Sequence, residues 1–469
     1  MKELVTLEEA AQAVNKTTHN IRDYIQRGRI AKYNPDGEVI ARAKNGELRV
    51  DLVELRLFLH LVNQQNEVHH HAGLNAELGF YDVPERERTK HVHRLHPYLG
   101  KFIPQLAEWF LRHYFSANDW VLDPFMGSGT TLIQANELGL NTIGTDISEF
   151  CCRIVQVKTH QYNLPKVHQE ILEAERRTQV FSSRLQHPQG VPTQLPLFDD
   201  EFESFRAQLL SECDSDYLKT WFAPNALLEI LYYKRLIEQA GFEYPDLLRV
   251  LLSRAVRSSR LVPHYDLATP KAPLPVGIEY DCRKHRRMCL PIDNAISKIH
   301  AYSEDTYRRL ATFDQLRKPT EIHVLHGDAR TVDLTPALQG RQLAGIFTSP
   351  PYVGQIDYHD QHIYAYELFG IPRNDTLEIG PKAKGKSKKA QQDYVEGISA
   401  VLRNIAPFVK PDGKFLMVAN DRFGLYPEIA QRAGLQIVET HQRAVTKRTE
   451  QGDDPYQETI FHMQKVDRL

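Results

Sequence analysis

Residues 120–131 read WVLDPFMGSGTT, and this stretch decides the fold of the chain. The apolar residues 120–122 predict a short buried strand, and Gly127 and Gly129 predict a turn into a helix. Glycine lets the backbone approach a ligand closely, and a helix N-terminus favours an anionic group such as a carboxylate. Residues 140–146 predict a second strand that ends at Asp146, roughly 20 residues past the turn, where an acid meets ribose hydroxyls in nucleotide-binding sheets. A glycine turn that serves only tight packing is the alternative at this point.

A second stretch, TSPPY at residues 348–352, follows the apolar run Leu343–Phe347, which predicts another buried strand. The two prolines end that strand, because neither can donate to a β-ladder and each fixes its own φ. A polar side chain, a rigid backbone and an aromatic ring therefore stand at the carboxyl end of a strand, where open α/β sheets bind ligands. Such a loop suits a flat ring that carries an amino group. A Pro-Pro turn that only closes a core strand is the alternative.

Taken together, the two stretches resemble the amino-methylating DNA methyltransferases, which use S-adenosylmethionine (SAM). HPYLGKFIP at residues 96–104 resembles the additional cofactor motif of that family, and the resemblance covers about 90–165 and 320–469. It implies an α/β fold with a Rossmann-like seven-stranded sheet, and it implies that Ser349, Pro350, Pro351 and Tyr352 are catalytic. The cofactor contacts that it implies come from Lys101, Phe102, Pro104, Asp123, Pro124, Phe125, Gly127, Ser128, Gly129, Thr130, Thr131, Asp146, Ile147, Asp328, Ala329 and Thr348.

The reaction implied by the resemblance is direct methyl transfer to the exocyclic amino nitrogen of a base extruded from double-stranded DNA. None of the five cysteines follows a proline, so the Pro-Cys nucleophile of cytosine-C5 enzymes is absent. Ser349 stands where related enzymes carry aspartate or asparagine, and this resembles the N4-cytosine branch, so we favour N4-cytosine over N6-adenine. An RNA base methyltransferase and a winged-helix regulator without catalysis are further alternatives. The family resemblance implies a restriction or phage-defence system, with cognate proteins of that system as partners.

Residues 1–65 predict a small separate domain, followed by a linker over 66–90. Thr6 and Glu9 form a capping-box pattern at the start of a helix over 7–14, and a second helix is expected over 18–26. A strand pair at 30–33 and 48–50 and a third helix over 51–61 complete an order that resembles the winged helix-turn-helix domains of excisionases and MerR-type regulators. DNA contact is expected from Arg22 and Arg27, and a protein-docking module is the alternative.

About 160 residues separate the second strand from the third, which is expected at 322–330 with Asp328 at its end. We therefore divide the methyltransferase domain into 91–165 and 320–469, with a mostly helical insertion at 166–319 as the candidate target-recognition domain. Helices are expected at 217–239 and 244–260, and His359 is expected to line the target pocket. Phosphate contacts are expected from basic side chains in the insertion and in a lysine-rich, mobile loop at 382–389, with solvated charged faces as the alternative. These side chains are Arg257, Arg260, Arg283, Arg286, Lys384 and Lys386.

Two short patterns in the insertion are weaker. Residues 186–203 predict a flexible linker, within which Gln194–Phe198 resembles the peptides that dock replication proteins on the sliding clamp. Cys282, His285 and Cys289 form part of a zinc spacing, but no fourth ligand is obvious nearby, so no metal is expected.

Composition is compatible with this interpretation. A chain of 469 residues predicts two or three domains, and a formal net charge of −2 means that DNA contact requires local basic patches. Five cysteines without regular spacing predict a reducing, cytoplasmic location. No signal peptide or membrane-spanning run is expected.

Overall fold

The computed structural model describes residues 3–14, 16–26, 30–40, 48–56, 75–80, 83, 87–186, 197–268, 270–444 and 457–466. The chain divides into two compact units, Met1–Asn75 and Ala76–Leu469. In the described residues, no helix is long and apolar enough to cross a membrane.

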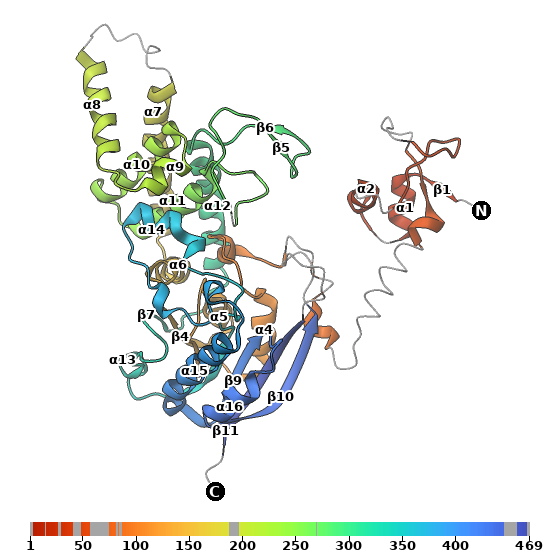
Figure 1. Cartoon of the computed structure of the whole chain (residues 1–469), viewed down its shortest axis with the longest axis vertical. Helices are drawn as coiled ribbons and strands as arrows, with labels where there is room; N and C mark the ends of the chain where they lie inside the picture. Colours follow the sequence, from red (N-terminus) through yellow and green to blue (C-terminus); the bar gives the residue numbers. More distant parts are fainter. Residues whose placement is uncertain are drawn as a thin grey trace. The chain divides into compact units, whose positions relative to one another are not determined.

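In its described residues, the first unit contains the helices α1 and α2, a further helical stretch and a small antiparallel sheet (Figure 1). The expected capping box is present at α1 (Leu7–Ala13), and α2 covers Thr18–Gln26 as predicted. Strand β1 (Leu4–Val5) pairs with β2 (Val50–Asp51), and residues 52–56 are helical. The winged-helix assignment itself stays a prediction.

The second unit is built on a seven-stranded sheet in the order β10-β11-β9-β8-β3-β4-β7. Its neighbouring strands are parallel except β11, which is antiparallel to both β9 and β10, so the predicted α/β fold with a closing antiparallel pair is confirmed. The strands are β3 (Trp120–Asp123), β4 (Asn141–Asp146), β7 (Ile322–His326), β8 (Leu343–Thr348), β9 (Val409–Ala419), β10 (Leu435–Ala444) and β11 (Gln457–Lys465).

Alternating side chains of these strands bury both faces of the sheet. Phe347, Leu416 and Ile460 pack with α4 (Pro104–Tyr114) on one face. Their sequence neighbours Ile346, Phe415 and Phe461 pack on the other face, in the core that α15 and α16 complete. The remaining elements of the methyltransferase part are α5 (Thr130–Glu137), α6 (Glu149–Thr159), α13 (Thr335–Leu338), α14 (Ile363–Phe369), α15 (Lys388–Ile405), α16 (Tyr426–Arg432), η1 (Ala76–Gly79), η2 (His91–Arg94), η3 (Asp360–His362), η4 (Asp375–Leu377), η5 (Lys382–Lys384) and η6 (Ala406–Phe408).

The sheet has a topological switch point between β3 and β8. From β3 the chain continues outward through β4 to β7, whereas from β8 it continues in the opposite direction to β9. The helices that follow these strands must therefore lie on opposite faces, which leaves a crevice at the carboxyl ends of β3 and β8. A ligand site is expected at that crevice.

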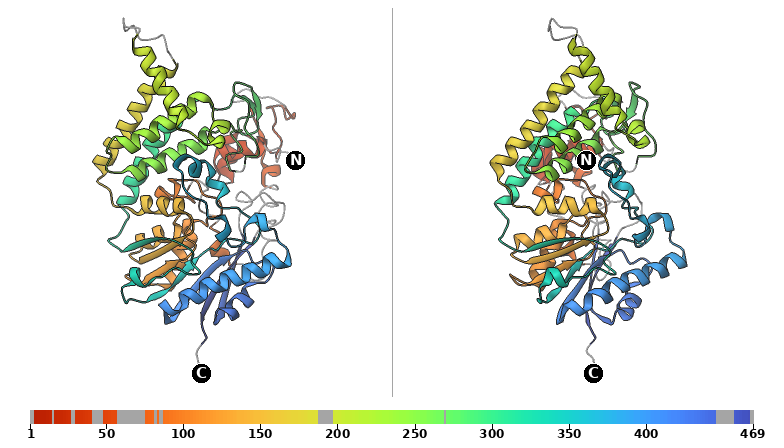
Figure 2. Two further views of the ribbon diagram at one scale, coloured as in Figure 1. Left: turned by 60° about the vertical axis from the view of Figure 1, so that its left-hand side comes forward. Right: turned by 90° about the vertical axis from the view of Figure 1, so that its left-hand side faces the viewer.

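The insertion between β4 and β7 is mostly helical, as predicted, and packs around a single large apolar core at one end of the sheet (Figure 2). Its elements are α7 (Leu164–Gln186), α8 (Leu197–Ser211), α9 (Asp216–Trp221), α10 (Pro224–Gln239), α11 (Pro245–Ser259), β5 (Tyr280–Cys282), β6 (Arg287–Cys289) and α12 (Ile296–Asp314). Its role in target recognition stays a prediction.

Two local predictions were wrong. The helix expected over 217–239 is divided into α9 and α10, because Phe222 and Ala223 are extended before Pro224, which disfavours a helical residue before it. The linker expected at 186–203 is helical at both ends, in α7 and α8, and residues 187–196 lie outside the described part. The lysine-rich segment contains η5 and the Ser387-capped start of α15, and its mobility stays a prediction. The clamp-like peptide at 194–198 lies outside the described residues, except that Leu197 and Phe198 begin α8; their side chains are not described either.

Candidate active site

A cleft of about 930 Å³, measured to its open mouth, lies at the carboxyl ends of β3, β4, β7 and β8. The cleft brings together most of the residues predicted from the sequence, namely Lys101, Phe102, Asp123, Pro124, Phe125, Gly127, Ser128, Thr130, Asp146, Ile147, Asp328, Ala329, Ser349 and Pro351. The predicted residues that are not among those lining it are Pro104, Gly129, Thr131, Thr348, Pro350 and Tyr352.

The two glycines of the turn have different tasks. Gly127 has a φ of +47°, and a Cβ there would lie 2.9 Å from the hydroxyl oxygen of Tyr98, inside the cleft. Gly129 has a φ of +80° and precedes α5, and a Cβ there would lie 2.9 Å from a Val155 methyl group in the protein interior. Gly127 therefore gives room at the ligand site, whereas Gly129 serves the tight packing that the sequence left as an alternative.

Asp123 links the two strands at the switch point. Its carboxylate accepts hydrogen bonds from the Thr348 hydroxyl at 2.6 Å and from the Phe125 N–H at 3.1 Å. Burial nevertheless raises the pKa of Asp123 to about 6. The hydrogen bond between Thr348 and Asp123 thus fixes the start of the TSPPY stretch to the end of β3, although Thr348 itself does not line the cleft.

Asp146 presents a carboxyl group to the cleft at the end of β4. One oxygen accepts the Gly127 N–H at 3.0 Å, and the other accepts the Ser148 N–H at 2.8 Å. Burial raises the pKa of Asp146 to about 7. Each carboxylate oxygen can accept at least one further hydrogen bond, so this group suits ribose hydroxyls.

Asp328 lies beyond the end of β7 and is already paired. The Arg330 guanidinium donates to its two oxygens at 2.9 and 2.6 Å. Although burial acts to raise the pKa of Asp328, the pairing with Arg330 lowers it, so Asp328 is an ionised acceptor. Its predicted contact with the adenine amino group stays a prediction.

Lys101 supplies a cation to the same cleft. Its ammonium group donates to the His93 carbonyl at 2.9 Å, and burial lowers its pKa to about 8. The cleft therefore offers a cation for a carboxylate, a carboxyl group for ribose hydroxyls and the space beside Gly127 that a Cβ would fill. These residues fit SAM, which carries a methionine carboxylate and a ribose.

The TSPPY stretch contains a chain of hydrogen bonds behind the cleft. The Tyr352 hydroxyl lies 3.1 Å from Glu458, whose other oxygen pairs with the buried Arg443 at 2.8 Å. A carboxylate only accepts, so Tyr352 donates to Glu458 and accepts from the Ser349 hydroxyl at 3.3 Å. The Ser349 proton thus points away from the ligand, which leaves its lone pairs for a donor in the cleft. The half-buried Tyr352 packs against the core on the α15 side of the sheet.

Several cleft residues were not identified as site residues from the sequence. Tyr98 lies inside the quoted stretch 96–104, and Tyr358 precedes His359, which also lines the cleft. The place of His359 in a target pocket stays a prediction. Glu378 had no sequence signal. It accepts the His359 N–H at 2.9 Å, and burial raises the pKa of Glu378 to about 7.

The predicted DNA contacts are divided by burial. Arg22, Arg283, Arg286, Lys384 and Lys386 are exposed, and Arg27 lies outside the described residues. Arg257 is half-buried and lines a second cavity beside residues 97–99.

Arg260 is a correction. Its side chain is 3% exposed and donates to the carbonyls of Leu267 at 2.6 Å and Arg257 at 3.1 Å, so it stabilises the fold and is not available to a phosphate. Arg254, on the same helix, is likewise held by Asp305 at 2.7 Å.

Comparison with known proteins identifies the family. A DNA methylase family profile matches residues 60–157. The chain is 37% identical to the type II methyltransferase M.MjaII of Methanocaldococcus jannaschii over 98% of this chain and 97% of that protein. It is 32% identical to the type II methyltransferase M.BsoBI of Geobacillus stearothermophilus over 73% of this chain and 64% of that protein.

Among solved structures, the rRNA methyltransferase AviRa of Streptomyces viridochromogenes aligns with 78% of this chain and 88% of its own length, at 11% identity and a TM-score of 0.29. That similarity is too low to bear on function. The similarity to M.MjaII covers nearly the whole of both chains, insertion included. The chain belongs to the type II DNA methyltransferases, a family of SAM-dependent enzymes.

Proposed function

We propose that this enzyme methylates the exocyclic N4 of cytosine in duplex DNA, in the cytoplasm, as part of a restriction-modification or phage-defence system. The observation that carries the proposal is the position of Ser349, which lines the cleft while its hydroxyl proton is directed to Tyr352. The choice of cytosine rests on serine at this position, where aspartate or asparagine would resemble the N6-adenine branch. The type II designation of the relatives supports a modification system.

The loop at the end of β8 suits an amino group because it offers acceptors and few donors. An exocyclic amino group has two N–H donors, and its lone pair is delocalised into the ring, so it is a weak nucleophile. Pro350 and Pro351 have no backbone N–H that could compete for an acceptor on the base. Ser349 Oγ and the Pro350 carbonyl accept the two amino protons, which localises the lone pair and directs it at the methyl group.

SAM, when bound, supplies a methyl group activated by a positively charged sulfur. Lys101 holds the carboxylate end of the ligand, and Asp146 accepts from its ribose hydroxyls. Asp123 keeps Thr348 in place, so that Ser349 stays in register with the glycine turn. The residues of the chain thus bind and orient two reactants, and no protein nucleophile is needed.

A base stacked in a duplex cannot reach the end of β8, so the target is extruded into the cleft. In the proposal, the part of the Tyr352 ring that is not packed against the core stacks on the extruded base beside the cleft. The exposed cations Arg283, Arg286, Lys384 and Lys386 contact phosphates, together with Arg22 of the first unit.

Nucleoside mass spectrometry tests the proposal. Duplex DNA of diverse sequence is incubated with the purified protein and SAM, digested, and compared with the same reaction of the Ser349→Ala variant. An N4-methylcytosine peak that the variant lacks is the expected result. An N6-methyladenine peak would keep the enzyme but overturn the base assignment. With neither product, activity on RNA would favour an RNA methyltransferase, and no activity on either would favour a regulator.

A further inference from the structure

The segment between α11 and α12 has little regular structure to hold it. In the described residues of the segment 260–295, the regular structure is limited to two three-residue strands, β5 and β6, which pair as a short hairpin. Several apolar side chains of the segment are exposed rather than packed, namely Val276, Ile278, Met288 and Leu290. The two cysteines of the hairpin, Cys282 and Cys289, are buried, at 0% and 8% exposure. A segment with so small a core commonly needs a disulfide or a metal ion.

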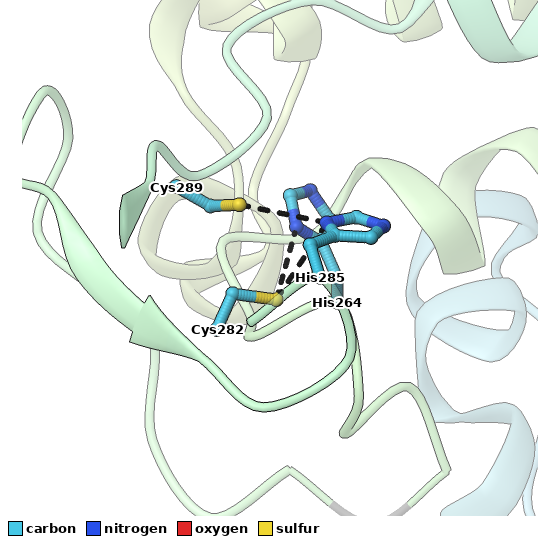
Figure 3. Close-up of side chains that lie close together, drawn as sticks. All are labelled: His264, Cys282, His285 and Cys289. Carbon is cyan, nitrogen blue, oxygen red and sulfur yellow. Dashed lines mark hydrogen bonds between the residues drawn. The ribbon is translucent and has the colours of Figure 1, made fainter. Parts of the chain in front are cut away.

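The buried cysteines meet two histidines at one point (Figure 3). Cys282 Sγ lies 3.7 Å from His285 Nδ1 and 3.8 Å from His264 Nδ1, and Cys289 Sγ lies 3.5 Å from His285 Nδ1. One possible ligand atom from each of the four residues lies within 4.8 Å of all the others. His264 comes from the stretch that follows α11, so the cluster ties that stretch to the hairpin.

These separations are those of a tetrahedral metal site. Zinc binds sulfur at about 2.3 Å and imidazole nitrogen at about 2.0–2.1 Å, so neighbouring sulfur and nitrogen ligands of one ion lie about 3.6 Å apart. The three measured sulfur–nitrogen distances, 3.5, 3.7 and 3.8 Å, bracket this value. Two thiols and two imidazoles in a tetrahedron are a ligand set typical of zinc among the common metals.

The hairpin backbone brings the ligands together. Arg286 adopts a left-handed conformation with a φ of +53° and donates its N–H to the Cys282 carbonyl at 2.7 Å. This turn folds His285 back over the strands toward both sulfur atoms.

We propose that His264, Cys282, His285 and Cys289 bind one structural zinc ion. With four protein ligands the site is closed and has no open position for substrate, so the ion stabilises the fold and takes no part in methyl transfer. His264 Nδ1 lies 2.8 Å from the Tyr280 hydroxyl, and the bond to the ion replaces that contact. The Tyr280 hydroxyl keeps a donor, because the backbone N–H of His264 lies 2.9 Å from it. The site holds the turn that carries Arg283 and Arg286, and it is independent of which base is methylated.

Metal analysis of the full-length protein, purified without chelators from zinc-supplemented cells, tests the proposal. We expect about one zinc per chain in the wild type and at least a tenfold loss in the Cys282→Ser/Cys289→Ser double variant. Cys213→Ser is the matched control, because Cys213 is also a buried free thiol of the insertion but is not in the cluster. It should keep the wild-type zinc content.

Cobalt substitution tests whether the four residues bind a metal ion even if the double variant does not fold. Wild-type protein stripped of metal and given Co²⁺ should show the intense visible bands of a four-coordinate ion and a thiolate charge-transfer band. Addition of Zn²⁺ should abolish them and restore the melting temperature. The proposal is overturned if the wild type contains no zinc and gives no such bands, if the double variant retains its zinc, or if a Cys282–Cys289 disulfide is found in its place.

Discussion

In the cleft, the carboxyl groups of Asp123 and Asp146 line a space that a ligand can fill, whereas in the insertion the guanidinium groups of Arg254 and Arg260 are held by acceptors of the protein itself. The pKa values of the two carboxyl groups are raised to about 6 and about 7 by burial. The arginines are held by an ion pair in one case and by backbone carbonyls in the other.

This difference shows that a polar residue at the end of a strand indicates a functional site more directly than a charged residue on a helix does. The end of a parallel strand lies at one edge of the sheet whatever its neighbours are, so a polar residue there points to a site. A charged residue on a helix can face solvent, a partner helix or a nearby loop, and the sequence alone does not distinguish these. The sequence therefore indicates the ligand-site residues at the strand ends better than it indicates which basic residues of the insertion contact DNA.

The largest effect is expected from Ser349→Ala in the cleft. Loss of a preorganised hydrogen-bonding group aimed at a reacting atom typically costs about 10²–10³ in kcat. Cofactor affinity should change less than about twofold, because the hydroxyl acts on the base. Single-turnover methyl transfer and calorimetric SAM binding measure the two effects. Unchanged transfer would remove Ser349 from the reaction.

The matching change in the insertion is Arg254→Ala, which should affect stability and leave the salt dependence of DNA binding as it is. Breaking a buried ion pair costs about 3–5 kcal/mol, and the loss should be nearer the lower value because Asp305 also pairs with Arg309 at 2.7 Å. Urea denaturation measures it. Arg308→Ala is the control, since Arg308 is 72% exposed and pairs with the same carboxylate. A loss as large in the control would contradict the distinction between the buried and the exposed pair.

Two substitutions of Tyr352 separate its hydroxyl from its ring. Tyr352→Phe removes the acceptor of the Ser349 proton and should lower kcat about tenfold, the value of one hydrogen bond of roughly 1.4 kcal/mol. Tyr352→Ala should lower it further if the ring stacks on the target base. Equal rates for the two variants would assign the whole effect to the hydroxyl and end the stacking role.

The pH dependence of SAM binding tests whether the cleft carboxyl groups meet the ligand. Asp146, with its pKa at about 7, is mostly protonated at pH 6 and mostly ionised at pH 8. A positively charged ligand favours the carboxylate, so binding releases a proton, and affinity should rise about tenfold over this interval. Above pH 8 affinity should fall as Lys101, with its pKa at about 8, loses its charge. Asp146→Asn should flatten the rising limb. A profile that keeps its rise in this variant would assign it to another group.

The smallest effect is expected at the exposed turn of the insertion. Arg283→Ala should lower the slope of log affinity for DNA against log salt by about 0.9, the loss of one phosphate contact, and leave the unfolding free energy unchanged. Binding titrations at several salt concentrations measure the slope. No change would place Arg283 outside the DNA interface.

The order of motifs in the sequence was sufficient to predict the sheet and many of the residues that line the cleft. The strands at 120–123, 141–146 and 322–326 and the glycine turn were predicted because their apolar runs and breakers are local. Glu378 and His264 could not be predicted as site residues, since each joins its partners only through tertiary folding. The break before Pro224 carried a local signal, the proline itself, which the apolar periodicity of 217–239 outweighed.

The insertion between β4 and β7 also has a consequence for synthesis. Asp146 pairs with His326 in the finished sheet, so β4 leaves the ribosome roughly 180 residues before its edge partner. At about 5–20 residues per second, that partner is delayed by about 10–35 s. During this time one edge of β4 has no strand to pair with and can recruit a strand from another chain. Early folding of the helical insertion beside that edge would shorten the time that β7 needs to find β4. The folded insertion brings its own two ends together, and therefore also the two strands that flank it.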